Sequence, residues 1–350
     1  MVTPARLPLP PTTPARVLAV RGDTASYRGD AVVTEEPMEI RVRGLHQEPV
    51  AVAVTMRTPG ADFELAVGFL HTEGLLADPT VVSSVTYCDE EDLGQPAPGE
   101  ASQSAGDARE LVTGARDGRI RPVGSAKGSA TNTVTVALGV PFAPPTPRAF
   151  VAGAACGICG STSIEALARW VRPVGEGVEV SLAVLRTLPL VLRERQRVFA
   201  ATGGLHAAGL FAPSGELSSL AEDVGRHNAL DKLIGRAALA GALPIPHLVL
   251  LVSGRVSFEI IQKAAVAGIS VVAAVSAPSS LAIATAEALN MTLVGFLRDT
   301  SCNVYTHPRR VVGSLEGGGA SARGGACAGN APISRTGGRS ASPPGVRLTS

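Results

Sequence analysis

Apolar and polar residues alternate along the first half of the chain, which is typical of strands with one buried face. The alternation covers residues 31–58 and returns over residues 132–138. A Thr-Pro-Gly turn ends the first run, after which Asp62 can cap a helix that ends near Gly74. Residues 91–130 are acidic and then rich in Gly, Ser and Ala, so they predict an inserted loop or a poorly packed hairpin.

Continuous apolar runs, separated by helical patterns, characterise the second half. The runs are residues 247–253, 270–276 and 291–297, and their lack of alternation indicates strands that are buried on both faces. Helical patterns connect them over residues 258–267 and 280–290. This order predicts an α/β fold with a parallel core and right-handed crossovers. Ligands bind beyond the carboxyl ends of strands in such sheets, so the residues that follow each run are candidates for a site.

Composition changes at the ends of the chain and divides it into four parts. We predict a disordered Pro-rich N-terminus over residues 1–18 and a smaller β-rich subdomain over residues 19–147. An α/β domain over residues 148–312 follows, and residues 313–350 form a disordered tail rich in Gly, Ser and Arg.

Charge and composition exclude several classes of function. The chain has 31 basic and 30 acidic residues and only 3% aromatic residues, which gives no reason to expect binding to nucleic acid. The N-terminus has no continuous apolar core, so no export signal or membrane anchor is expected. Residues 264–286 are uncharged, but a Ser-Ala-Pro-Ser-Ser turn interrupts them, which favours a buried strand and helix over a membrane span. Five cysteines, an odd number, suggest the reducing cytoplasm rather than a secreted disulfide framework.

Cys156 and Cys159 form the sharpest chemical feature of the sequence, a C-x-x-C pair surrounded by small residues. The small neighbours leave both thiols open to a large reactant. Ser161 or Ser163 could cap a following helix, whose dipole would lower the pKa of the thiols. These features predict a nucleophilic cysteine.

Three common uses of a C-x-x-C pair fit this sequence less well. A structural zinc site needs a second close pair, but Cys88, Cys302 and Cys327 are scattered. A thioredoxin-like protein carries its C-x-x-C early in a small domain. A zinc deaminase needs Pro before the first cysteine and an upstream His-x-Glu, whereas Ala155 stands there and His206-Ala207-Ala208 lacks the Glu and lies downstream.

Two histidine segments could contribute acid/base chemistry. His206 follows paired glycines that permit close approach of a ligand, although a packing role is equally open. Asp223, His227 and Asp231 would share one face of a helix, and two carboxylates could then orient the imidazole. The alternative is a solvated amphipathic helix with its apolar residues inward.

Ser253, Gly254 and Arg255 follow a buried strand and precede a helix, which is a natural place for an anion. Arg255, Lys263 and Arg298 are placed to supply positive charge. The sequence contains neither a P-loop nor a G-x-G-x-x-G turn, so an ordinary nucleotide hydrolase or dehydrogenase is not supported.

Several segments together resemble the FdhD family of formate dehydrogenase accessory sulfur carriers. The similarity extends from about Val32 to Arg310. The segments that carry it are Arg57-Thr-Pro-Gly60, Gly68-Phe-Leu-His-Thr-Glu-Gly74, Cys156-Gly-Ile-Cys-Gly160, Thr202-Gly-Gly-Leu-His206, Glu222-Asp-Val-Gly-Arg-His-Asn-Ala-Leu-Asp-Lys232, Ser253-Gly-Arg255 and Leu293-Val-Gly-Phe296.

The resemblance implies a cytoplasmic sulfurtransferase that takes sulfur from a cysteine desulfurase as a persulfide on Cys156, with Cys159 assisting or resolving. The sulfur then passes to the molybdenum cofactor, Mo-bis-molybdopterin guanine dinucleotide, before that cofactor enters apo formate dehydrogenase. A homodimer is possible. The implied fold is a cytidine-deaminase-like α/β sandwich without the catalytic zinc, hence with no metal ligands.

The implied cofactor-binding stretch follows the last buried strand and is joined by the other strand-end positions. Two other functions stay open, a thiol-disulfide oxidoreductase that uses the C-x-x-C pair and a non-catalytic chaperone that binds the cofactor. The expected cofactor-binding residues are Phe296, Leu297, Arg298, Asp299, Thr300, Ser301, Ser253, Gly254, Arg255 and His206.

Overall fold

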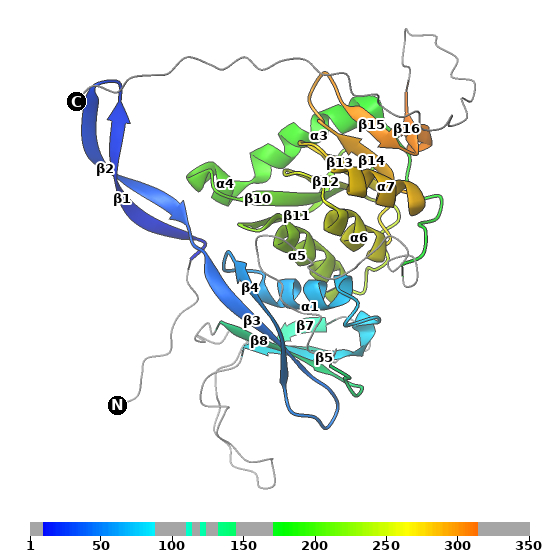
Figure 1. Ribbon diagram of the computed structural model, residues 1–350. Coiled ribbons are helices and arrows are strands. Elements are labelled where there is room, and N and C mark those ends of the chain that lie inside the picture. The colour runs from blue at the N-terminus through cyan, green and yellow to red at the C-terminus, as the bar shows by residue number, and fades with distance from the viewer. Residues whose placement is uncertain (1–9, 88–109, 114–119, 124–131, 145–170, 314–350) are drawn as a thin grey trace, which may run out of the picture. The chain divides into compact units, whose positions relative to one another are not determined.

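The computed structural model describes residues 10–87, 110–113, 120–123, 132–144 and 171–313. Two six-stranded sheets and two small two-stranded sheets account for the strands in these ranges. Figure 1 shows the elements, with the N-terminal strands in blue and cyan and the C-terminal sheet in green to orange. The chain is therefore a mixed α/β protein, as the sequence predicts.

An antiparallel ribbon of β1 (Thr12–Arg21) and β2 (Thr24–Val33) precedes the sheets. The prediction of disorder over residues 1–18 is therefore wrong from Thr12 onward. Each strand of a two-stranded ribbon has a free edge, where a proline costs no ladder hydrogen bond, so Pro14 fits within β1. The Oγ1 atoms of Thr13 and Thr34 lie 2.8 Å apart and join the ribbon to the chain that follows.

The N-terminal sheet has the strand order β4-β3-β8-β5-β6-β7. Only the β3–β8 pair is parallel among its ladders. A hairpin of β6 and β7 lies within the predicted insertion at 91–130, and it extends the sheet because β6 also pairs with β5. The bounds are β3 (Glu36–Arg43), β4 (Val50–Arg57), β5 (Val82–Tyr87), β6 (Glu110–Thr113), β7 (Ile120–Val123) and β8 (Thr133–Leu138).

Helix α1 (Asp62–Thr72) packs on this sheet through Leu65, Phe69 and neighbouring apolar residues. Asp62 does not cap it as predicted. The N-cap is Ala61, in the left-handed region with φ 54°, and Asp62 is the first helical residue. Its carboxylate accepts hydrogen bonds from Arg57 at 3.0 and 3.1 Å and is buried. Asp62 therefore holds the end of β4 against the start of the helix.

The C-terminal sheet has the order β11-β10-β12-β13-β14-β15. The predicted parallel core is confirmed for β12, β13 and β14, while β10, β11 and β15 are antiparallel to their neighbours. The sheet is thus mixed. The strands are β10 (His206–Phe211), β11 (Leu217–Asp223), β12 (Val249–Val252), β13 (Val271–Ala274), β14 (Thr292–Gly295) and β15 (Asn303–Thr306).

Helices cover both faces of this sheet. Leu250, Val272 and Leu293 face one core cluster with α5, α6 and α7, whereas Leu251 and Val294 face a second cluster with α3. Because successive strand residues enter different clusters, β12 and β13 are apolar at every position and β14 is apolar after its first residue, Thr292, as the continuous runs predict. The helices are α3 (Leu182–Arg195), α4 (Arg197–Thr202), α5 (Arg226–Leu239), α6 (Phe258–Val266) and α7 (Ser280–Ala288).

None of the described helices is long and apolar enough to cross a membrane. The described residues up to Gly313 belong to one compact unit, although each large sheet takes its strands from one side of residue 147. The division into domains at 147/148 stays a prediction. The short elements are η1 (Pro79–Val81), η3 (Pro308–Arg310), and β16 (Val311–Val312), which pairs in parallel with β9 (Val180–Ser181).

Two glycines bring α1 and α5 into direct backbone contact, and these helices lie side by side (Figure 1). A Cβ added at Gly68 would lie 1.9 Å from the carbonyl oxygen of Asp231, and one added at Gly235 would lie 1.8 Å from that of Glu64. No other residue type fits at this distance without moving the helices apart. The crossing fixes α1 beneath the helix that begins at the candidate site.

Candidate functional site

The carboxyl ends of β12, β13 and β14 meet at one edge of the sheet, as expected for parallel strands. Antiparallel β10 begins at this edge, and antiparallel β11 ends there, so His206 stands opposite Asp223. Backbone hydrogen bonds join the loops: Ser253 N–H donates to Ala207, Val256 N–H to Ala277 and Phe296 N–H to Ser276. We call this edge, with the residues that contact it, the strand-end site; it comprises His206, Asp223, Arg226, His227, Glu259 and residues 253–257, 275–279 and 296–301.

Gly254 lies at the centre of the positions that the sequence selected. An added Cβ there would be 3.2 Å from His206 Nδ1 and 3.5 Å from the Cδ atom of Arg226. Ser253 Oγ accepts a hydrogen bond from the Ala207 N–H at 2.9 Å, which ties the loop to the start of β10. The structure therefore brings together His206, Ser253 and Gly254, and adds Arg226, which the sequence analysis did not select.

The histidine at the start of β10 is half-buried between positive neighbours. Burial lowers the pKa of His206, and the charges of Arg226 and His227 lower it further. Asp223 acts in the opposite direction but does not outweigh them. His206 is therefore a neutral imidazole at pH 7, able to donate one hydrogen bond and accept another.

His227, Ser257 and Glu259 form a polar cluster beside His206. His227 Nε2 lies 3.1 Å from Ser257 Oγ and 3.0 Å from a Glu259 carboxylate oxygen, and Ser257 Oγ donates to that carboxylate at 2.8 Å. A hydrolase triad needs the serine and the acid on opposite ring nitrogens. Because both contacts here involve Nε2, the cluster orients the imidazole and is not a nucleophilic triad.

The Glu259 carboxylate has a pKa of about 2, lowered chiefly by its hydrogen bond to His227 and also by the one from Ser257. A depressed folded-state pKa stabilises the protein above the ordinary pKa of about 4.5, and this contribution is lost as the pH falls toward 2. We expect Glu259→Gln to remove this part of the loss of folding stability in acid. The free energy of unfolding, measured with urea between pH 5 and pH 2, should fall less steeply for the variant than for the wild type. If it falls equally steeply for both proteins, the assignment is contradicted.

The predicted helix face of Asp223, His227 and Asp231 does not exist. Asp223 is the last residue of β11, and α5 begins three residues later at Arg226. The spacing suggested one helix because sequence alone did not reveal the turn at Gly225. The alternative of a solvated amphipathic helix is right about its inward apolar residues, which are buried, but wrong about solvated charges, since Asp231 and Lys232 of α5 are buried too.

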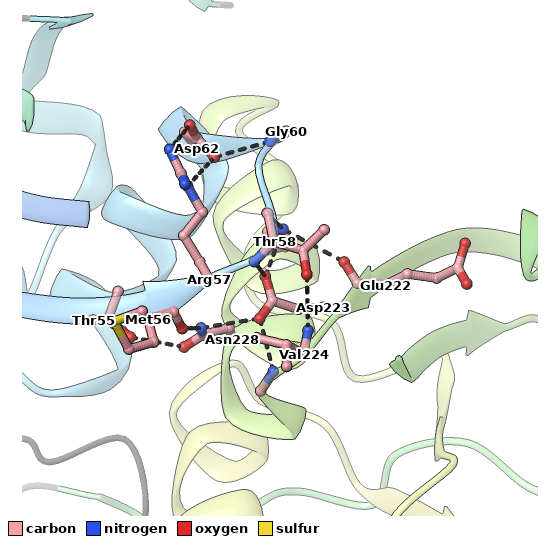
Figure 2. Close-up of polar contacts among 12 residues, drawn as sticks. Thr55, Met56, Arg57, Thr58, Gly60, Asp62, Glu222, Asp223, Val224 and Asn228 are labelled. Atoms are coloured by element: carbon pink, nitrogen blue, oxygen red, sulfur yellow. Dashed lines mark hydrogen bonds and ion pairs between the residues drawn. The ribbon is translucent and has the colours of Figure 1, made fainter. Parts of the chain in front are cut away.

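Asp223 is a structural ion-pair partner (Figure 2). Its carboxylate lies 2.7 Å from Lys232 Nζ and accepts hydrogen bonds from the N–H groups of Thr58 and Gly225 and from Asn228. Lys232 in turn donates to the Thr58 carbonyl oxygen at 2.9 Å. The network joins the turn after β4 to the start of α5, so Asp223 holds the framework of the site.

Lys263 cannot supply free charge to an anion, contrary to the sequence-based prediction. It is buried, with Nζ 3.0 Å from Asp231 and 2.7 Å from Glu73. Burial lowers the pKa of Lys263, but the two carboxylates outweigh burial and raise it above the ordinary value. The lysine therefore stays charged and neutralised by its partners.

The predicted cofactor stretch, residues 296–301, emerges from the end of β14. Phe296 has φ 52° and a 43% exposed side chain, whereas Leu297 is fully buried in the core. Arg298 turns back onto the sheet, because its side chain donates to the carbonyl oxygens of Val275 and Leu297. Its N–H donates to the Ser301 carbonyl oxygen, which closes a turn. Asp299, Thr300 and Ser301 are exposed, as is Arg255.

The C-x-x-C pair, Cys156 and Cys159, lies outside the described residues. Of the five cysteines, the structure describes Cys302, which is half-buried, and burial raises the pKa of its thiol. Within the described ranges, no three His, Cys, Asp or Glu side chains lie close enough to hold a metal ion.

Three residues of the site were missed by sequence reasoning. Arg226 lies inside a segment that was selected for its neighbours, and Ser257 and Glu259 directly follow the Ser-Gly-Arg turn. Their significance depends on contacts between α5, α6 and β10, which no local spacing indicates.

Comparison with known proteins agrees with this architecture. The FdhD/NarQ family matches residues 33–312. The chain is 43% identical over 299 residues to a protein of Streptomyces avermitilis named "Sulfur carrier protein FdhD", covering 85% of this chain and 94% of that one. A protein of the same name from Mycobacterium tuberculosis is 43% identical over 306 residues, covering 86% of this chain and 98% of that one.

A solved structure has a similar fold. The crystal structure of a protein described as a formate dehydrogenase accessory protein from Desulfotalea psychrophila superimposes with a TM-score of 0.59 at 19% identity. The similarity covers 87% of this chain and all of that one.

Proposed function

Because the chain belongs to the FdhD/NarQ family, we propose that it accepts a persulfide sulfur from a cysteine desulfurase and transfers it to the molybdenum cofactor. Cys156 is the carrier, and Mo-bis-molybdopterin guanine dinucleotide is the acceptor before it enters formate dehydrogenase. The names of the relatives support the coarser role of sulfur carrier.

The observation that carries the acceptor half of this proposal is the composition of the strand-end site. An exposed aromatic ring at Phe296 can stack on a planar heterocycle, and Arg255 and Arg226 can pair with phosphates. Gly254 lets the loop backbone approach both His206 and Arg226 closely. A large polyanionic cofactor with a guanine ring needs this combination. Leu297 would contribute only its backbone.

The transfer of sulfur onto Cys156 and its release as sulfide need no external oxidant. The Cys156 thiolate attacks the terminal sulfur of the donor persulfide, forms a new S–S bond and releases the donor thiolate, which is a transfer with no net redox change. When Cys159 then attacks Cys156 Sγ, the terminal sulfur leaves as sulfide for the cofactor. The resulting Cys156–Cys159 disulfide accounts for the two electrons, and a dithiol reductant must reduce it by thiol–disulfide exchange before the next cycle.

The first test is the persulfide itself. After incubation with a cysteine desulfurase and cysteine, peptide mass spectrometry is expected to find one added sulfur on Cys156. The half-buried Cys302 should remain unmodified and serves as an internal control, because burial raises its thiol pKa. Absence of the added sulfur from Cys156, with a donor that loads a known acceptor, would refute the proposal.

Two alternatives make different predictions. A thiol-disulfide oxidoreductase would reduce a disulfide substrate catalytically with the same cysteine pair. A cofactor-binding chaperone would keep both cofactor binding and biological function when Cys156 and Cys159 are both replaced.

The proposal includes several finer expectations from the family resemblance. They are a cytoplasmic location, association with apo formate dehydrogenase, a possible homodimer and a cytidine-deaminase-like sandwich. The three-stranded parallel core with helices on both faces supports the last of these.

A further inference from the structure

We propose that one face of the β1–β2 ribbon is a docking surface for apo formate dehydrogenase. Apolar side chains of the two proteins pack together there, and a carboxylate of the dehydrogenase pairs with Arg16. The inference rests on the proposed function for the identity of the partner and adds the surface that this partner contacts. Residues 12–32 of the ribbon lie before the segment that matches the family, so family membership by itself assigns no function to this face.

The register of the ribbon divides its side chains between two faces. Residues that pair directly across an antiparallel ladder lie on the same face, and every second residue of a strand shares that face. Leu18 pairs with Tyr27 and Val20 with Ala25, so these four side chains lie together. We call their side of the ribbon the apolar face; it comprises Pro14, Arg16, Leu18, Val20, Ala25, Tyr27, Gly29 and Ala31.

The apolar face is open to solvent. The side chains of Leu18, Val20 and Tyr27 are 51%, 67% and 66% exposed. Neither β1 nor β2 pairs with any other described strand, and a two-stranded ribbon without further packing is only marginally stable in water. Neighbouring exposed apolar side chains that include an aromatic ring and an arginine are typical of protein–protein interfaces. A partner that covers this face therefore stabilises the ribbon as well as binding to it.

The charges of the ribbon favour an acidic partner over a second copy of this chain. Arg16 is the only charged residue of the apolar face, and its guanidinium carbon lies 4.5 Å from the centre of the Tyr27 ring. The ribbon's carboxylates lie elsewhere, because Asp30 is on the opposite face beside Arg28 and Asp23 is in the turn between the strands. Two copies packed through this face would bring together cations without a carboxylate, whereas a carboxylate of another protein would neutralise Arg16.

The inner end of the apolar face adjoins the strand-end site. Val33 pairs with Thr12 and thus continues this face, and a Cβ added at Gly204 would lie 2.8 Å from Val33 Cγ2. His206 follows Gly204 by two residues. A protein that receives the cofactor must approach the strand-end site, whereas a sulfur donor has to reach only Cys156. The place of the ribbon therefore favours the dehydrogenase over the cysteine desulfurase as its partner.

Binding of the full-length chain to immobilised, purified apo formate dehydrogenase tests the apolar part of the surface. Leu18→Thr and Tyr27→Thr should each weaken binding by a factor of about ten or more, as for central apolar residues of an interface. Threonine is chosen because it favours strands and so preserves the ribbon. Val32→Thr is the matched control, since Val32 is 41% exposed and pairs with Thr13 on the opposite face. It should bind as the wild type does.

Charge reversal tests the partner's carboxylate in the same assay. Arg16→Glu should weaken binding by a factor of about ten at low ionic strength, mainly through slower association, and by less at high salt. Arg21→Glu makes the same change of charge at an exposed position of the opposite face and should bind nearly as tightly as the wild type.

Hydrogen exchange of the wild-type chain tests the surface without any substitution, and it decides the matter if a variant loses the ribbon. Added apo formate dehydrogenase should slow exchange of the amides of β1 and β2. Added cysteine desulfurase should leave their exchange unchanged. Exchange that the dehydrogenase does not slow would overturn the proposal.

Two further results would overturn it. One is equal weakening of dehydrogenase binding by Leu18→Thr and Val32→Thr. The other is a dimer of this chain that Leu18→Thr dissociates in sedimentation, because a second copy would then cover the face. Cys156→Ala should bind the dehydrogenase normally, and Leu18→Thr should take up sulfur from the desulfurase normally. Failure of sulfur loading and failure of docking are therefore separate outcomes.

Discussion

Cells in which Cys156→Ala replaces the wild-type chain are expected to lose formate dehydrogenase activity by a factor of about 100 or more. The reason is that a carrier without its nucleophile has no atom to hold the transferred sulfur. Activity in extracts, measured at equal amounts of dehydrogenase protein, tests this expectation. Cofactor content should be measured in parallel, because the proposal predicts that the dehydrogenase lacks functional sulfurated cofactor.

Cys302→Ala is the matched control for that experiment. Cys302 is half-buried, and burial raises the pKa of its thiol, so little reactive thiolate is present at neutral pH. The control should keep full activity. Cys159→Ala should still take up one sulfur on Cys156 but release it slowly. Full activity of the Cys156 variant would exclude the carrier mechanism and favour the chaperone alternative.

The C-terminal sheet could be predicted from sequence because its signal is local. Each of β12, β13 and β14 has side chains that enter two different core clusters, so all residues of these strands except Thr292 are apolar. The residues that begin α7 and end α6 could also be predicted from the neighbouring sequence alone. Ser279 caps α7 through the Ala282 N–H, and Gly268, with φ 76°, follows α6.

The site could be predicted only in part, because its charges are paired over long separations. Lys263 and Glu73 are 190 residues apart in sequence, and the buried partner of Asp231 lies on another helix. The sequence alone shows three separate charged residues, whereas the structure shows one lysine paired with two carboxylates. Helical spacing likewise could not reveal that Asp223 ends a strand. The residues that follow the buried strands could be predicted as site residues, because parallel strands bring their carboxyl ends to the same edge of the sheet.

The contact between α1 and α5 gives the largest effect expected on stability. Gly235→Ala should destabilise the protein by about 3 kcal/mol or more, above the ordinary range for overpacking, because the new Cβ meets backbone rather than a movable side chain. It would lie 1.8 Å from the Glu64 carbonyl oxygen and 2.7 Å from the Gly68 nitrogen. Alanine favours an isolated helix over glycine by about 1 kcal/mol, so helix propensity acts in the opposite direction.

Gly175→Ala is the matched control, because a Cβ at that position meets nothing within 4 Å. Urea unfolding of both variants should show a large loss for Gly235→Ala and almost none for the control. Gly68→Ala should act like Gly235→Ala, and the double variant should lose less than the sum, since helices that have already separated accommodate the second methyl group. Separation would also loosen the contact of Lys263 on α6 with Thr72 and Glu73, through which α1 is held beside the candidate site. A Gly235→Ala protein as stable as the wild type would show that the two helices do not cross as closely as the structure indicates.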